Sequence, residues 1–164
     1  MRTLLPAILA LVLVGCSPTI KGPLSFQPPQ DWKVAKESDP NFYSVTAKNP
    51  DEGLLMLSEW PLSARADEMP ALVQQLADGF PKKASTSPEF TLSSQEHRVE
   101  SFSGEQCQGS YATFQATSTA SGKNILLAMF MVSVDGKIWN GQFTGTPDAW
   151  KQALNVLKGI KRSG

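Results

Sequence analysis

Cysteine and histidine are scarce in this chain, and their scarcity excludes several kinds of site. The 164 residues include two cysteines, Cys16 and Cys107, and one histidine, His97. A zinc site normally takes three or four histidine, cysteine or carboxylate ligands, and the sequence places no such cluster around His97 or Cys107. Glycine-rich nucleotide-binding motifs are missing as well. We therefore expect no metal site and no cofactor.

An excess of charge of one sign is also missing. Lysine and arginine together number 15, as do aspartate and glutamate, so the net charge is zero. Proteins that bind nucleic acid cluster their basic residues against phosphates, so we expect no nucleic-acid partner. Long hydrophobic runs are absent too. The apolar run Leu4–Val14 has only about 11 residues, whereas a membrane-spanning helix needs roughly 20.

That short run, preceded by Arg2, has the form of a cleavable signal peptide spanning residues 1–15. It ends in Leu13-Val14-Gly15-Cys16, which resembles the lipobox of bacterial prolipoproteins. The resemblance implies that Cys16 is lipidated and becomes the mature N-terminus. The next residue is Ser17 and not aspartate, which by Gram-negative sorting rules implies the outer membrane, facing the periplasm. The alternative is an ordinary secretory signal that happens to end in a cysteine.

Removal of the signal leaves roughly 150 residues, enough for one domain with one core. We expect residues 16–23 to form a tether and residues 24–164 to form the domain, because the prolines between residues 18 and 29 disfavour helix. If Cys16 is lipidated, Cys107 has no partner for an internal disulfide.

Alternating apolar residues and turn signals predict a series of strands. A possible first strand is Leu24–Phe26, and the others are expected at Trp32–Lys36, Phe42–Ala47, Leu54–Trp60, Thr91–Glu100, Gln108–Ser118, Asn124–Val134 and Lys137–Thr144. Ser103-Gly104 and Asp135-Gly136 are expected to be hairpin turns. Both faces of Ile125–Val132 are apolar, which indicates a strand that is covered on both sides.

Two segments have helical periodicity instead. Apolar residues from Met69 to Phe80 recur on one helical face, and Gly79 and Pro81 are expected to end that helix. Thr146 is a plausible N-cap for a second helix whose apolar stripe runs from Trp150 to Ile160. The predicted fold class is α+β: an antiparallel sheet flanked by two helices, which makes an α/β/α sandwich.

This order of elements resembles the PsbP-like superfamily, to which the DcrB-like bacterial lipoproteins belong. The residues that carry the resemblance are Gln30-Asp31-Trp32 before the first clear strand and the stretch from Trp139 to Pro147 that leads into the last helix. The resemblance implies a small non-enzymatic module for binding or assembly. Some secretion-system immunity lipoproteins are similar in size and lipobox. No functional residue is carried over.

Catalytic residues are expected to be absent, because His97 and Cys107 are the one pair that could supply a base and a nucleophile. Counting residues about Ser103-Gly104 places Cys107 near Glu100 and His97 near Ser110, so the pair is not directly opposed. Acidic loops at Asp51-Glu52-Gly53 and Asp67-Glu68 lack the alternating oxygens of a calcium-binding loop.

The four tryptophans are the remaining candidates for a binding surface. Trp139 and Trp150 lie on stripes assigned to the core, while Trp60 precedes a polar loop and is the one expected to be most exposed. We therefore predict that Trp60, Asp67 and Glu68 contact a protein partner, in the sharpest version a cell-wall hydrolase that this chain inhibits as an immunity protein. The alternative functions are envelope maintenance or assembly of the DcrB type and, on His97 and Cys107 alone, an enzyme.

Overall fold

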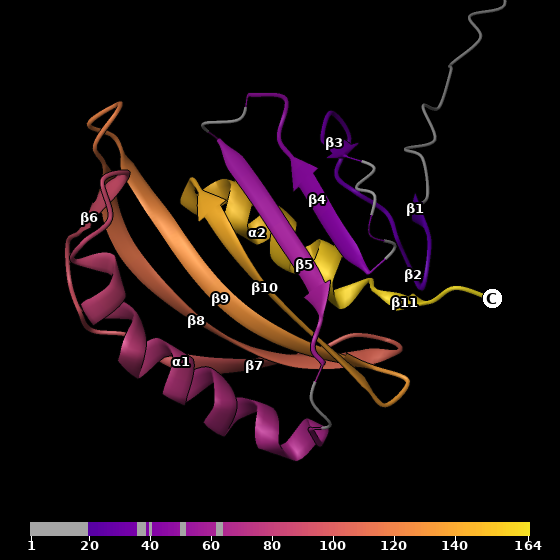
Figure 1. Cartoon of the computed structure of the whole chain (residues 1–164). Helices are drawn as coiled ribbons and strands as arrows, with labels where there is room; N and C mark the ends of the chain where they lie inside the picture. Colours follow the sequence, from indigo (N-terminus) through magenta and orange to yellow (C-terminus); the bar gives the residue numbers. More distant parts are fainter. Residues whose placement is uncertain (1–19, 36–38, 40, 50–51, 62–63) are drawn as a thin grey trace, which may run out of the picture.

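The computed structural model describes residues 20–35, 39, 41–49, 52–61 and 64–164, which form a large antiparallel sheet with one helix on each face (Figure 1). The strands of this sheet, in spatial order, are β3 (Lys33–Ala35), β4 (Phe42–Thr46), β5 (Gly53–Glu59), β10 (Lys137–Gly145), β9 (Asn124–Val134), β8 (Cys107–Ser118) and β6 (Phe90–Leu92), and β7 (Val99–Ser103) also pairs with β8. The helices are α1 (Met69–Ala84) and α2 (Pro147–Lys158), with a 3₁₀ helix at Ala66–Glu68. The predicted α+β sandwich is confirmed.

The centre of the sheet is the meander β8-β9-β10. Every residue from Ile125 to Val134 is buried except Met129, which is partly buried, so β9 is covered on both faces as predicted. The hairpin between β9 and β10 turns at Asp135 and Gly136, which have φ of 50° and 76°. Positive φ at both central positions matches the right-handed twist of the flanking strands. This expected turn is therefore confirmed.

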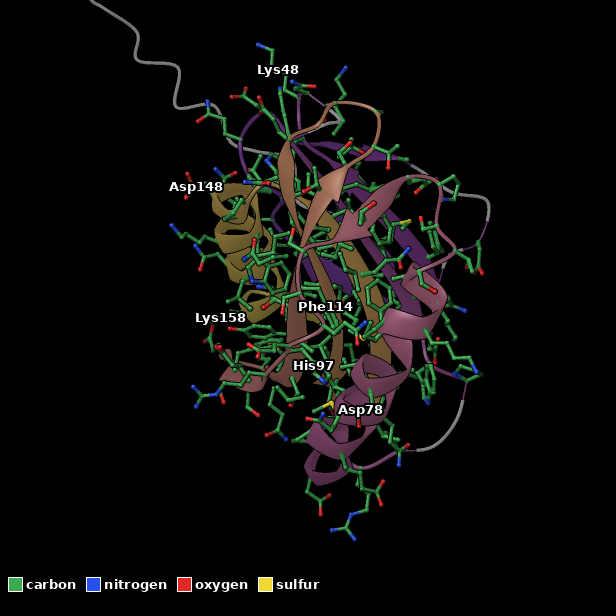
Figure 2. The ribbon with its side chains drawn as sticks, turned by 90° about the vertical axis from the view of Figure 1, so that its left-hand side faces the viewer. Lys48, Asp78, His97, Phe114, Asp148 and Lys158 are labelled. Atoms are coloured by element: carbon green, nitrogen blue, oxygen red, sulfur yellow. The ribbon has the colours of Figure 1, made fainter. Side chains whose placement is uncertain are left out.

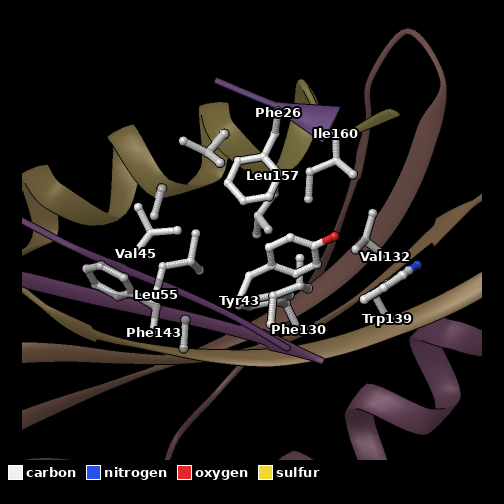
Figure 3. Close-up of a cluster of buried hydrophobic side chains, with 14 of the residues drawn as sticks. Phe26, Tyr43, Val45, Leu55, Phe130, Val132, Trp139, Phe143, Leu157 and Ile160 are labelled. Atoms are coloured by element: carbon white, nitrogen blue, oxygen red, sulfur yellow. The ribbon is translucent and has the colours of Figure 1, made fainter. Parts of the chain in front are cut away.

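The sheet face covered by α2 holds the larger, aromatic core (Figure 3). Trp139 and Trp150 are only 1% and 6% exposed, which confirms their assignment to the core. The ring of Trp150 lies 5.3 Å from that of Phe143 and 5.2 Å from that of Tyr111. Thr146 caps α2 as predicted, because its side chain accepts a hydrogen bond from the backbone N–H of Ala149 at 3.2 Å.

The face covered by α1 holds a smaller core of Val73, Ala77, Phe114 and their neighbours. The predicted end of α1 at Gly79 and Pro81 is wrong, since the helix continues to Ala84. Proline removes one intrahelical hydrogen bond. The helix nevertheless continues because Phe80 packs on Phe114, with ring centroids 4.9 Å apart, and Ala84 is 5% exposed.

The predicted single strand Thr91–Glu100 is also wrong. It is divided into β6 and β7, which pair with opposite ends of β8 while residues 93–98 leave the ladder. The hairpin to β8 turns later than Ser103-Gly104, because the N–H of Gly104 donates to the carbonyl of Cys107 and Ser103 pairs with Gln108. Glu100 consequently lies opposite Tyr111 and not Cys107, a shift of the predicted register.

A second, small sheet covers part of α2 and joins the two ends of the described chain. It consists of β1 (Ile20–Lys21), β2 (Leu24–Phe26) and β11 (Lys161–Arg162), and β2 was the only one of these expected. Leu24 and Phe26 pack in the core on the α2 face. Cys16 and residues 17–19 lie outside the described residues. Among the helices of the described chain, none has the length and apolarity needed to cross a membrane.

Candidate functional site

The short turn before α1 presents the acidic residues that the sequence singled out. Asp67 accepts two hydrogen bonds from the guanidinium of Arg65, both 3.0 Å long, and Glu68 Oε2 accepts from the Arg65 backbone N–H at 2.8 Å. The side chains of Arg65 and Asp67 are 78% and 67% exposed. The turn is thus held in one shape while its charged groups face solvent. We call residues Arg65–Glu68 the acidic turn.

Trp60 lies on the same side of the sheet but is less available than the sequence suggested. Its backbone N–H donates to the carbonyl of Ile138 at 2.8 Å, which fixes the residue at the end of β5. Its side chain is partly buried and packs on the core beneath α1, as do Ala64 and Ala66 on either side of Arg65. Trp60 and the acidic turn therefore belong to one face, with the turn as its projecting part.

His97 and Cys107 lie on opposite sides of the sheet. The ring of His97 packs on Phe114 at 5.1 Å, beneath α1, as Figure 2 shows. Cys107 belongs instead to the core under α2, where its thiol donates to the carbonyl of Leu157 at 3.2 Å. Burial raises the pKa of the Cys107 thiol, which disfavours the nucleophilic thiolate. The pair therefore cannot act as nucleophile and base.

The environment of His97 fastens the irregular segment 93–98 to α1. Its Nε2 lies 3.0 Å from Asp78 Oδ1 and 3.0 Å from Gln74 Nε2, and its Nδ1 lies 3.2 Å from the carbonyl oxygen of Gln95. A hollow of about 480 Å³ adjoins it, lined also by Lys82 and Ser85. Ser85 Oγ donates to the carbonyl of Lys82 and not to His97, so this serine is not activated as a nucleophile.

Metal ligands are not brought together in the part of the chain that the structure describes. No three histidine, cysteine, aspartate or glutamate side chains gather there closely enough to hold an ion. Glu52, in one of the acidic loops, accepts a hydrogen bond from Asn49 Nδ2 at 3.4 Å. Asp51 of the same loop lies outside the described residues.

A polar groove that the sequence did not suggest runs between residues 25–30 and α2. It has a volume of about 620 Å³, and Gln30, Gln152, Asn155 and Lys161 lie along it. Gln152 Oε1 accepts a hydrogen bond from Trp32 Nε1 at 3.1 Å, which holds the segment after β2 against the helix. Because the groove joins residues more than a hundred positions apart, no local pattern could have predicted it.

Comparison with known proteins concerns the fold alone. No family model and no curated protein matches this sequence. A solved protein from Bacteroides thetaiotaomicron is 11% identical with a TM-score of 0.53 over 87% of this chain, which spans 46% of that protein. LpqN, described as involved in cell envelope biogenesis of Mycobacterium tuberculosis, is 17% identical, with a TM-score of 0.49 and coverage of 86% and 83%. The cyanobacterial PsbP of Synechocystis is 14% identical, with a TM-score of 0.49 and coverage of 92% and 95%. Similar solved structures thus include a PsbP protein.

Proposed function

We propose that this protein is a non-enzymatic lipoprotein of the bacterial envelope, anchored through Cys16 on the periplasmic side of the outer membrane, that binds a protein partner. The observation that carries the proposal is the run Leu4–Cys16, with its lipobox-like ending, placed directly before a folded domain. Within the described residues, the separation of His97 from Cys107 favours binding over catalysis.

The arrangement of the two helices indicates which side of the domain meets the partner. The chain enters through β1, which pairs with β2, and β2 packs on the α2 side of the large sheet. The acidic turn and α1 lie on the other side of that sheet, at the bottom of Figure 1. A membrane anchor near β1 leaves the α1 side free for a soluble partner, so we assign partner binding to Trp60, Asp67 and Glu68 on that side.

In its sharpest form the proposal is that of an immunity protein. A turn that is already held by three hydrogen bonds loses little freedom when a partner immobilises it, so more of the contact energy appears as affinity. Asp67 and Glu68 outnumber Arg65 in the turn, so its exposed surface is net negative and complements a basic cleft. We therefore expect the acidic turn to insert into the active-site cleft of a cell-wall hydrolase that reaches the periplasm.

The test is a capture experiment with the acylated protein in vesicles, exposed to the envelope and secreted fractions of its own organism. One hydrolase bound in stoichiometric amount, and inhibited, supports the immunity form. Several envelope proteins bound in small amounts support the alternative, envelope maintenance or assembly of the DcrB type. Capture of nothing, together with hydrolysis of a substrate that depends on His97, contradicts the proposal of a binding protein.

The matched variants are Asp67→Lys and Asp148→Lys. Each aspartate is exposed and pairs with a basic residue two or three positions away, at 3.0 Å to Arg65 and 2.9 Å to Lys151, but they lie on opposite sides of the sheet. We expect Asp67→Lys to weaken partner binding at least about tenfold, as loss of a complementary interface charge does, and Asp148→Lys to leave it unchanged. Equal effects of the two substitutions on binding would contradict the assignment of partner binding to the acidic turn.

A further inference from the structure

The reach of the chain before β1 limits where the domain can lie relative to an anchor at Cys16. Only residues 17–19 separate Cys16 from Ile20, the first residue of β1. A residue spans at most about 3.6 Å when extended, so the Cα atoms of Cys16 and Ile20 are no more than roughly 15 Å apart. The small sheet therefore stays close to the headgroup layer if Cys16 carries acyl chains.

Two lysines lie beside that entry point. Lys158 ends α2 and Lys161 begins β11, and among the described residues neither forms an ion pair (Figure 2 labels Lys158). Arg162 pairs with Asp135. Glu105 lies in the hairpin whose Gly104 is so close to the Lys158 carbonyl that a Cβ there would clash with it. Two unpaired ammonium groups remain available to anions.

The polar groove opens beside these lysines. Lys161 lines one part of it, and the amide groups of Gln152 and Asn155 supply hydrogen-bond donors from the exposed side of α2. Phe26 and Val156, both buried, also line the groove. A volume of about 620 Å³ with an ammonium and amides suits a phosphate that carries polyol groups, which is the chemistry of an anionic phospholipid headgroup.

From the short reach, the unpaired lysines and the groove, we infer that the face formed by β1, β2, β11 and the C-terminal end of α2 lies on the membrane. The groove takes the headgroup of an anionic phospholipid such as phosphatidylglycerol. This inference rests on the proposed anchor at Cys16 and adds the orientation of the domain and a lipid-binding surface. We call residues Lys158–Arg162 together with the groove the membrane face.

The α1 side offers a matched comparison, because it also carries two exposed lysines at a helix C-terminus. Lys82 and Lys83 occupy the last turn of α1, as Lys158 occupies the last turn of α2. The C-terminal end of α1 lies across the large sheet from the small sheet, on the left in Figure 1. The two lysine pairs carry the same charge but lie at different distances from the proposed anchor. A difference between them in lipid contact therefore reports the orientation of the domain and not charge alone.

The experiment measures distance from labelled residues to the lipid headgroups. The acylated protein, with Cys107→Ala to remove the other thiol, carries a fluorescent maleimide on Lys161→Cys or on Lys82→Cys. It is reconstituted in vesicles of phosphatidylethanolamine and phosphatidylglycerol in which some headgroups bear a nitroxide quencher. We expect quenching at position 161 to exceed that at position 82 at least about threefold, since headgroup contacts act over short distances. Equal or reversed quenching overturns the inference.

Charge reversal tests the lipid chemistry of the same face. With the label on Gln30→Cys at the groove, Lys158→Glu with Lys161→Glu should lower quenching at least about twofold, as should replacement of phosphatidylglycerol by phosphatidylcholine. The control pair Lys82→Glu with Lys83→Glu should change nothing. If both charge pairs have the same effect, the membrane face has no specific lipid contact and the inference is wrong.

The mass of the purified protein distinguishes this failure from that of the proposed function. An unmodified Cys16 overturns the proposed anchor and the inference together. An acylated Cys16 with position 161 no closer to the headgroups than position 82 leaves the anchor in place and overturns the orientation alone.

Discussion

The two faces of the large sheet are covered by different kinds of apolar side chain. Beneath α2, aromatic side chains such as Trp139 and Phe143 pack together in the larger cluster (Figure 3). Beneath α1, small residues such as Val73 and Ala77, both fully buried, bring the helix close to the strands. Aromatic side chains remove more apolar area from water, so the α2 side should contribute more to the stability of the fold.

Polar side chains fasten two exposed segments on the α1 side. The α1 side carries the acidic turn and the hydrogen bonds of His97 to Gln74 and Asp78, which hold exposed segments in place without a large core. Substitutions of these polar residues should weaken partner binding more than they lower the free energy of unfolding. The α2 side is thus the more stabilising side and lies next to the proposed anchor, and the α1 side is the one that we propose to be available to a partner.

The largest test of this comparison replaces one aromatic ring on each side. Trp150→Ala should lower the free energy of unfolding by about 3–5 kcal/mol, because it empties a packed site among Phe143 and Tyr111. Phe80→Ala on α1 should cost only about 1–2 kcal/mol, because that ring is partly exposed already. Urea denaturation of both variants gives the two values, and equal losses would break the comparison.

The second test replaces the proline of each helix with alanine. Pro81→Ala should stabilise the protein by about 1 kcal/mol, because alanine restores the N–H that can donate to the Ala77 carbonyl within α1. Pro147→Ala is the control: this proline begins α2, where its N–H would have no helical partner, so we expect no gain. Thermal unfolding followed by circular dichroism measures both. A loss of stability in Pro81→Ala would contradict the prediction.

The helix caps give an effect of similar size. Thr146→Ala should lower the free energy of unfolding by about 1 kcal/mol, because the hydroxyl that accepts from the Ala149 N–H is lost. Thr146→Ser should retain most of the stability, because serine keeps that hydroxyl. The corresponding residue of α1, Glu68, makes no side-chain cap to the helix. Glu68→Ala should therefore leave α1 itself unaffected by loss of a cap. Chemical denaturation that shows equal loss in Thr146→Ser and Thr146→Ala would exclude the hydroxyl as the cause.

Ionisation of the tyrosines should have the smallest effect on stability at ordinary pH. Burial, together with the hydrogen bond to Glu100 and the charge of that residue, raises the pKa of Tyr111 to about 12, and burial also raises the pKa of Tyr43. The neutral phenol is favoured in the fold, so its contribution is complete below the unfolded value of about 10 and is lost as pH rises through about 12.

These are the only two tyrosines in the chain. Absorbance titration of the native protein should therefore show no tyrosinate step at the ordinary pKa. Tyr111→Phe should remove the step near 12. A native step at the ordinary pKa that disappears in Tyr111→Phe would contradict the burial of this phenol.

Elements with strong local signals could be predicted from the sequence. The two-sided apolar pattern of Ile125–Val132, the Asp135-Gly136 turn and the Thr146 cap each depend on a few adjacent residues, and all three are confirmed. The break in Thr91–Glu100 could not be predicted in this way. It depends on His97 meeting Asp78, 19 residues earlier in the chain, so only the tertiary fold decides it.

Long-range strand pairing also explains the parts of the candidate site that the sequence did not predict. β11 pairs with β2, so the small sheet and the polar groove require both ends of the domain at once. Trp60 follows a strand and precedes a polar loop, which suggested exposure. Its hydrogen bond to Ile138 and its packing beneath α1 follow from the pairing of β5 with β10.

The intact mass of the protein, purified from the membranes of its own organism, tests the proposed anchor at Cys16 most directly. We predict a mature chain that begins at Cys16, without residues 1–15, and carries the added mass of a diacylglyceryl group on that cysteine. A chain recovered from the periplasmic fluid with an unmodified Cys16, or with residues 1–15 still attached, would contradict the account.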